Sequence, residues 1–148
     1  MKITSSLLVV VAALVVGAGI GVAARKTGTI PGGIVKQPKS RFHYYRRYAD
    51  ALAREMSKGR ENLLVVTRIT ELSTQVVAGI SIFITIQVAF SDCRPESTEQ
   101  SKCKPLPCTP HYTCKALIFD QSGEMEFLQK DCNIKEMKTP VPTCRSLV

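Results

Sequence analysis

Six cysteines and two histidines are the residues of this chain with the most direct chemistry. A catalytic thiol needs a free cysteine beside a base, and an even number of cysteines argues against a free one. Zinc needs closely spaced thiol or imidazole ligands, but no Cys-x-x-Cys pair occurs, and His43 and His111 are far apart. We therefore expect no enzyme, no metal site and no cofactor. The cysteines instead predict disulfides formed in an oxidising compartment, among Cys93, Cys103, Cys108, Cys114, Cys132 and Cys144.

One of the many pairings that six cysteines allow has a local argument. Gly123 lies midway between Cys114 and Cys132 in the sequence, and glycine suits a hairpin apex because it tolerates positive φ. Opposed residues of an antiparallel pair lie ~4.5 Å apart at Cα, which is within disulfide range. We expect a last hairpin over about 113–120 and 125–132 that turns near Ser122-Gly123.

An apolar tip marks an earlier hairpin. The β-prone run 63–70 precedes Gln75–Gly79, and apolar residues alternate with other residues from Ile80 to Phe90. This pattern predicts strands at about 62–73 and 79–91 with a tip at Val76-Val77-Ala78. Hairpin tips are usually polar because they lie in water. An apolar tip therefore indicates a surface that enters a partner.

A helix is predicted before this hairpin. Ser40 is its candidate N-cap and Gly59 its candidate C-terminal stop. An apolar stripe at spacings of three and four would cover the buried face of the sheet, which gives an α+β fold; it consists of Phe42, Tyr45, Ala49, Leu52 and Met56. Glycine and proline oppose regular structure in the arm 25–39, and we expect a loop over 92–110.

The first residues predict secretion. Lys2, an apolar stretch from Leu7 to about Gly21 and the small residues Val22-Ala23-Ala24 are typical of a signal peptide over 1–24. One domain over 25–148 would then be extracellular, with no membrane contact after signal removal. The alternative is an uncleaved signal anchor, because the apolar run approaches the ~18 residues of a membrane helix.

Positive charge is the chain's other general property. Removing Lys2 leaves 19 basic residues against 12 acidic ones, a net charge of +7 for the mature chain. The basic residues are spread from Arg25 to Arg145. This distribution favours a solvated surface, with acidic partners as the alternative and no nucleic-acid partner expected.

The stretch Gln75-Val76-Val77-Ala78-Gly79 resembles the first hairpin loop of the cystatins, reversible inhibitors of papain-like cysteine proteases. The resemblance extends from Gly32 to Cys132 and is to the secreted type 2 cystatins, including arthropod salivary ones. It implies an antiparallel sheet wrapped around one helix and stapled by disulfides. It also implies competitive, non-covalent inhibition of cathepsins of the L, S, B or C type.

The resemblance also implies a wedge made of three segments. Ile30, Pro31 and Gly32 would occupy the non-primed side of the protease cleft, and the Gln75–Gly79 loop the primed side. Cystatins carry a Pro-Trp pair in the second hairpin, where this chain has Asp120-Gln121-Ser122-Gly123 and no tryptophan anywhere. We therefore expect Gln121, Ser122 and Gly123 to contribute little, and Pro31 to narrow selectivity.

The cystatin resemblance implies the disulfides Cys93–Cys103 and Cys114–Cys132, with the additional pair Cys108–Cys144 similar to some secreted arthropod cystatins. We expect a monomer, although exchange of the first hairpin between two copies would give a dimer that buries the first loop. The alternative function is a secreted cystatin-fold protein that does not inhibit proteases and instead binds acidic partners or acts in host defence.

Overall fold

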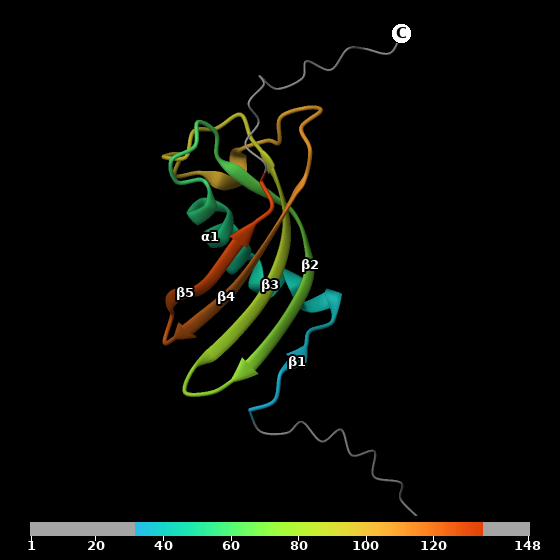
Figure 1. The fold of residues 1–148 in the computed structure, drawn as a ribbon, viewed down its shortest axis with the longest axis vertical. Helices are drawn as coiled ribbons and strands as arrows, with labels where there is room; N and C mark the ends of the chain where they lie inside the picture. Colours follow the sequence, from blue (N-terminus) through green and yellow to red (C-terminus); the bar gives the residue numbers. More distant parts are fainter. Residues whose placement is uncertain (1–31, 135–148) are drawn as a thin grey trace, which may run out of the picture.

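The computed structural model describes residues 32–134, which form one antiparallel sheet of order β1-β2-β3-β4-β5 against one α-helix (Figure 1). The elements in chain order are β1 (Val35–Lys36), the 3-10 helix η1 (Lys39–Tyr45), α1 (Arg46–Met56), β2 (Leu64–Val76), β3 (Ile80–Phe90), the 3-10 turn η2 (Gln100–Lys102), β4 (Tyr112–Gln121) and β5 (Glu124–Cys132). The sheet curves around α1, which contacts β2, β3 and β4. The α+β prediction is confirmed.

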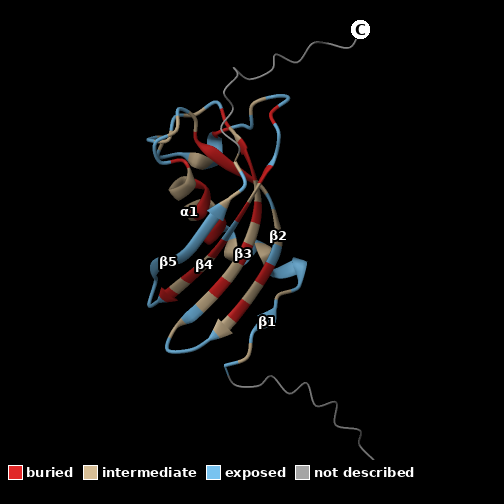
Figure 2. Cartoon of the chain, in the orientation of Figure 1, coloured by how far each residue is buried: buried red, intermediate tan, exposed pale blue. Residues whose placement is uncertain are grey.

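The core lies between α1 and one face of the sheet. Alternate residues of β3 from Ile82 to Val88 are buried, as the alternation predicts, and buried segments therefore alternate along the strands in Figure 2. Leu52 and Ala49 of α1 are fully buried against them. Ser57 fixes the helix end to the sheet, because its hydroxyl donates to the Ala53 carbonyl and accepts from the amide of Leu64.

The start of the helix differs from the prediction. Ser40 does not cap an α-helix; it lies inside η1, and α1 begins only at Arg46. A 3-10 helix has three residues per turn, so Phe42 and Tyr45 share one ridge and both pack on the core. The helix ends at Met56, and Gly59 adopts its positive φ of 75° in the following turn.

Both hairpins form, with shifted boundaries. Gln75 and Val76 belong to β2, so the first loop is only Val77–Gly79, and the arm is not wholly irregular because Val35 and Lys36 pair with β2. The second hairpin turns at Ser122 and Gly123, whose φ values are both positive, 55° and 93°. Positive φ at both central residues is the requirement of the tight turn that joins twisted strands.

Two predicted disulfides are present at the end of the sheet opposite these loops. Cys93–Cys103 closes the loop after β3, and Cys114 lies directly opposite Cys132 in the β4–β5 ladder with their Cα atoms 4.0 Å apart. The segment 92–110 is mainly loop, as predicted, apart from η2 and one bridge between Ser91 and Pro105. Cys144 lies outside the described residues, so the Cys108–Cys144 pairing remains a prediction.

Candidate functional site

Three segments far apart in the sequence meet at one end of the sheet, the lower end in Figure 1. They are the described start of the arm at Gly32, the first loop Val77–Gly79 and the second turn Ser122-Gly123; we call this the wedge end. Strand pairing brings them together. Val35 pairs with Thr74, which directs Gly32 toward the first loop, and Ile80 pairs with Asp120, which places the second turn beside it.

A hydrogen bond ties the arm to the first hairpin. The Gln75 side-chain Nε2 donates to the Gly32 carbonyl at 2.6 Å. Gly32 has a φ of 79°, a left-handed conformation that side-chain-bearing residues rarely adopt, while a Cβ there would meet nothing closer than 4.0 Å. Conformation rather than space therefore calls for glycine at position 32. Gln75 and Gly32, predicted to act on opposite sides of a cleft, are in direct contact.

The first loop is exposed and apolar. Val76 is 67% and Val77 49% exposed, and the backbone amide of Val77 donates to the Gly79 carbonyl within the loop. A Cβ on Gly79 would lie 2.7 Å from the Phe119 ring and 2.8 Å from the Asp120 carbonyl oxygen. Glycine at 79 thus lets the first hairpin lie close against β4.

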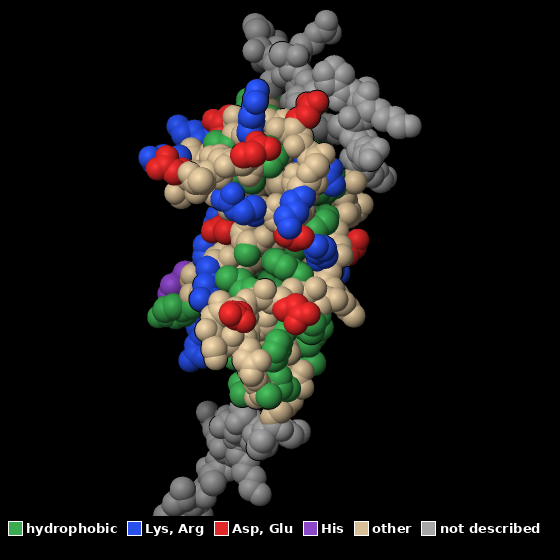
Figure 3. Space-filling view, turned by 90° about the vertical axis from the view of Figure 1, so that its left-hand side faces the viewer, with side chains coloured by type: hydrophobic (Ala, Val, Ile, Leu, Met, Phe, Trp, Pro, Cys, Tyr) green, Lys and Arg blue, Asp and Glu red, His purple; other side chains and the backbone are tan. Residues whose placement is uncertain are grey.

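Neighbouring strands extend this apolar surface. Val76 pairs with Ile80, Ile80 with Asp120 and Asp120 with Met125, and directly opposed residues point to the same face of a sheet. Ile80 and Met125 are 41% and 37% exposed, whereas Asp120, which lies between them, is covered by α1. We call Val76, Ile80 and Met125 the apolar row. Figure 3 shows hydrophobic side chains at this lower end, with acidic ones above them.

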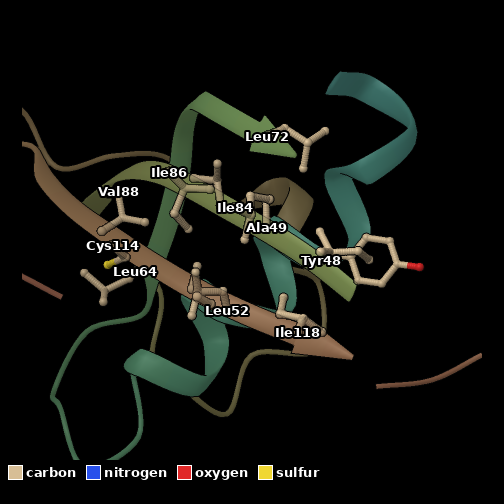
Figure 4. Packing of buried hydrophobic residues seen from close by; sticks show 14 of the residues in the cluster. Tyr48, Ala49, Leu52, Leu64, Leu72, Ile84, Ile86, Val88, Cys114 and Ile118 are labelled. Atoms are coloured by element: carbon tan, nitrogen blue, oxygen red, sulfur yellow. The ribbon is translucent and has the colours of Figure 1, made fainter. Parts of the chain in front are cut away.

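A charged cluster holds the second turn. The Asp120 side chain is only 7% exposed; its Oδ2 accepts from the Tyr48 hydroxyl at 2.6 Å and from Arg47 Nη2 at 2.6 Å, and its Oδ1 accepts from the Gly123 amide at 2.9 Å. Arg47 also hydrogen-bonds the Tyr48 hydroxyl. In Figure 4 the Tyr48 ring lies at the edge of the core cluster with its oxygen pointing outward. The start of α1 is thereby joined to the second hairpin.

This cluster shifts the proton affinities of its members. The hydrogen bond from Tyr48 is the main cause that lowers the pKa of Asp120 below its ordinary value, helped by the Gly123 amide and the Arg47 charge. Burial, the largest effect, raises the pKa of Tyr48. Asp120 is therefore ionised and Tyr48 neutral at neutral pH, which preserves the hydrogen bonds that hold the turn.

Sequence reasoning missed the cluster and the apolar row. Of the cluster, the sequence singles out only Asp120, as one of the residues that stand in place of the Pro-Trp pair. The alternation predicts that Ile80 lies on a buried face, yet Ile80 is 41% exposed. The strand alternation puts Ile80 on the helix side, but it does not show how completely each residue on that side is covered.

Two predicted site residues, Ile30 and Pro31, lie outside the described residues, as does the predicted signal peptide. Within the described residues 32–134, no three side chains among His, Cys, Asp and Glu come together as a metal site would require. In that same part of the chain, no helix has the length and hydrophobicity needed to cross a membrane.

Comparison with known proteins identifies the family. A sequence model of the cystatin domain matches residues 49–123. The chain belongs to the cystatin family. A relative, Cystatin-2 of Ornithodoros moubata, is 32% identical over 105 residues, covering 68% of this chain and 80% of that protein. Cystatin-1 of Chilobrachys guangxiensis is 30% identical over 94 residues, covering 59% and 70%.

A solved structure agrees with this membership. The salivary cystatin from the soft tick Ornithodoros moubata has a TM-score of 0.62 and 26% identity, and the match covers 71% of this chain and 100% of that one. The predicted resemblance to arthropod cystatins is therefore confirmed. Membership of the cystatin family, whose members inhibit proteases, also confirms that this chain is not an enzyme.

Proposed function

We propose that this cystatin is a secreted, reversible and competitive inhibitor of papain-like cysteine proteases of the cathepsin type. The observation that carries the proposal is the wedge end, where Gly32 and the exposed apolar loop Val77–Gly79 lie side by side and are joined by Gln75. Family membership supports the same class of partner.

The wedge would act by occupying the cleft without offering a bond for cleavage. Ile30, Pro31 and Gly32 enter the non-primed side, and Val76, Val77 and Ala78 pack on the primed side. Attack on a peptide bond needs reacting atoms about 3–3.5 Å apart in correct alignment, and a wedge that passes over the catalytic thiol presents none. Burial of the exposed Val76 and Val77 side chains supplies affinity.

The turn Gln121-Ser122-Gly123 contributes little to this contact, because all three residues are polar or small and exposed. The apolar row beside it is better suited to binding. Met125 and Ile80 present side chains that a protease surface can desolvate, and the Asp120 cluster fixes their position.

The test is titration of the protein against cathepsins L, S, B and C with a peptide substrate. Competitive inhibition of at least one enzyme is expected, and no inhibition of any at micromolar concentration would reject the proposal. The double variant Gln75→Ala with Val77→Asp should weaken inhibition by about 30-fold or more, as expected for a central contact worth about 2 kcal/mol.

A matched control makes the same chemical changes elsewhere. Gln129→Ala with Leu128→Asp alters two exposed residues in the middle of β5, away from the wedge end. Its inhibition constant should equal that of the wild type. Equal weakening by both double variants would show that the first loop has no special role.

Secretion and the third disulfide are tested together. The full sequence, expressed in a eukaryotic secretory host, should appear in the medium with Arg25 as its first residue, and peptide mapping should find Cys108 linked to Cys144. Recovery in the membrane fraction with residues 1–24 attached would reject the signal peptide and support the anchor.

A further inference from the structure

A second surface, separate from the wedge end, carries a concentration of positive charge. The chain has no acidic residue before Asp50, and the segment 36–47 contains Lys36, Lys39, Arg41, Arg46 and Arg47. All five side chains are exposed. The net charge of the whole chain does not reveal this local concentration, because acidic residues elsewhere offset its positive charge.

The 3-10 geometry of η1 decides which side chains face outward. Residues three apart lie on one ridge, so Phe42 and Tyr45 occupy the ridge that packs on the core. The two remaining ridges of η1 are Arg41–Tyr44 and Ser40–His43. Arg46 and Arg47 follow as the first residues of α1, and Lys39, at the start of the core ridge, is itself exposed. At about 2 Å rise per residue in η1 and about 1.5 Å in α1, the segment from Lys39 to Arg47 is ~15 Å long. We call Lys36, Lys39, Arg41, Arg46, Arg47 and the two rings of His43 and Tyr44 the basic strip.

Most of this charge is available for a partner. Arg46 pairs with Asp50 and Arg47 with Asp120, and both arginine side chains are still about half exposed. Lys36, Lys39 and Arg41 have no carboxylate partner within residues 32–134. These cations can neutralise an anion without breaking an interaction of the fold.

An aromatic platform lies within the strip. Tyr44 is 71% exposed, and its ring lies 3.8 Å, centroid to centroid, from that of His43. The two rings are inclined at 43° to each other, and both are exposed, so packing on the core does not explain them. A sugar ring presents apolar C–H groups that can stack on such a surface, while its sulfate groups meet the cations.

We propose that the basic strip binds sulfated polysaccharide. A membrane partner is less suited, because interfacial helices insert a whole apolar face, whereas η1 has no exposed aliphatic residue and only Ile34 and Val35 are exposed beside Lys36. A single-stranded nucleic acid is also less suited, because it stacks successive bases on several rings. Here Tyr45 and Tyr48 are turned to the core. Of the strip, only Arg47 touches the support of the wedge end, through Asp120, so this inference holds whether or not the wedge inhibits proteases.

The experiment measures heparin binding by the protein purified from a secretory host, over a series of NaCl concentrations. Lys39→Ala with Arg41→Ala should reduce the slope of log affinity against log salt by about 2, one for each cation removed. Lys102→Ala with Lys104→Ala removes the same charge from the loop after β3 and should leave affinity and slope nearly unchanged. Circular dichroism confirms that each variant is folded.

Tyr44→Ala separates stacking from simple charge attraction. It should lower heparin affinity about tenfold while leaving the salt slope unchanged, since no cationic group is removed. The proposal would be overturned if Lys39→Ala/Arg41→Ala and Lys102→Ala/Lys104→Ala reduced heparin affinity equally, or if Tyr44→Ala had no effect on it. So would equally tight binding to fully desulfated heparin, to single-stranded DNA or to phosphatidylserine vesicles.

Discussion

Gly79→Ala tests whether close packing of the first hairpin on β4 sets the shape of the wedge end. The new Cβ would lie 2.7 Å from the Phe119 ring and 2.8 Å from the Asp120 carbonyl oxygen. Ordinary carbon contacts are about 3.5–4.0 Å, so the ring alone must move by roughly 0.8 Å or more. The carbonyl belongs to the β3–β4 ladder and has less freedom, which forces the hairpin outward.

Overpacking of this kind costs about 1–3 kcal/mol, and we expect the free energy of unfolding to fall by that amount in urea titrations. The inhibition constant should rise about tenfold or more, because the displaced loop no longer fits fully into the protease cleft. A stable Gly79→Ala protein with unchanged inhibition would refute the close-packing argument.

Gly59→Ala is the matched control. A Cβ at Gly59 would meet nothing within 4 Å, but the residue has a φ of 75°. The cost is therefore conformational, about 1–2 kcal/mol, and it falls in the turn after α1. Stability should drop as in Gly79→Ala, while inhibition stays at the wild-type value. In the double variant Gly79→Ala/Phe119→Ala the Phe119 ring no longer clashes with the new Cβ. The double variant should therefore recover part of the inhibition that Gly79→Ala loses, because the two neighbouring positions are energetically coupled.

Three further changes test the support of the wedge end. Because the pKa of Asp120 is lowered in the folded protein, its ionised carboxylate stabilises the fold above the ordinary pKa of 3.8, and this contribution is lost as pH falls through the folded pKa. Asp120→Asn should therefore flatten the acid side of the curve of stability against pH and should also weaken inhibition. Glu55→Gln, the control, removes another carboxyl of lowered pKa and should alter only stability. Met125→Asp should weaken inhibition about tenfold or more with little loss of stability, because Met125 is partly exposed; unchanged inhibition would exclude the apolar row from the interface. Replacing Cys114 and Cys132 by serine should cost about 3 kcal/mol, given their separation of 18 residues, and leave inhibition intact at low temperature.

Local sequence patterns predicted the sheet and its second hairpin well. The alternation from Ile82 to Val88 has only one face to bury, so it determines which side meets the helix. Cys114 and Cys132 were paired correctly because the turn between them is short. The turn lies at Ser122-Gly123 as predicted, but the sequence gives no sign of the register shift between Leu117 and Ile118.

The helix start was wrong for a physical reason. Phe42 and Tyr45 are three residues apart, a spacing that fits both an α-helix and a 3-10 helix. The choice depends on how the two rings meet the sheet, which is a tertiary property. The same uncertainty hid the basic strip, because the outward ridges of η1 exist only once its three-residue turn is established.

The two ends of the sheet are held by different kinds of interaction. Both described disulfides lie at the end away from the wedge, so they cannot hold the first loop or the second turn. The wedge end depends instead on close packing at Gly79, on the Gln75–Gly32 hydrogen bond and on the Asp120–Tyr48 contact. Reduction of the disulfides should therefore lower the free energy of unfolding more than it lowers inhibitory potency. Disruption of the Asp120 cluster should lower inhibitory potency more than it lowers the free energy of unfolding.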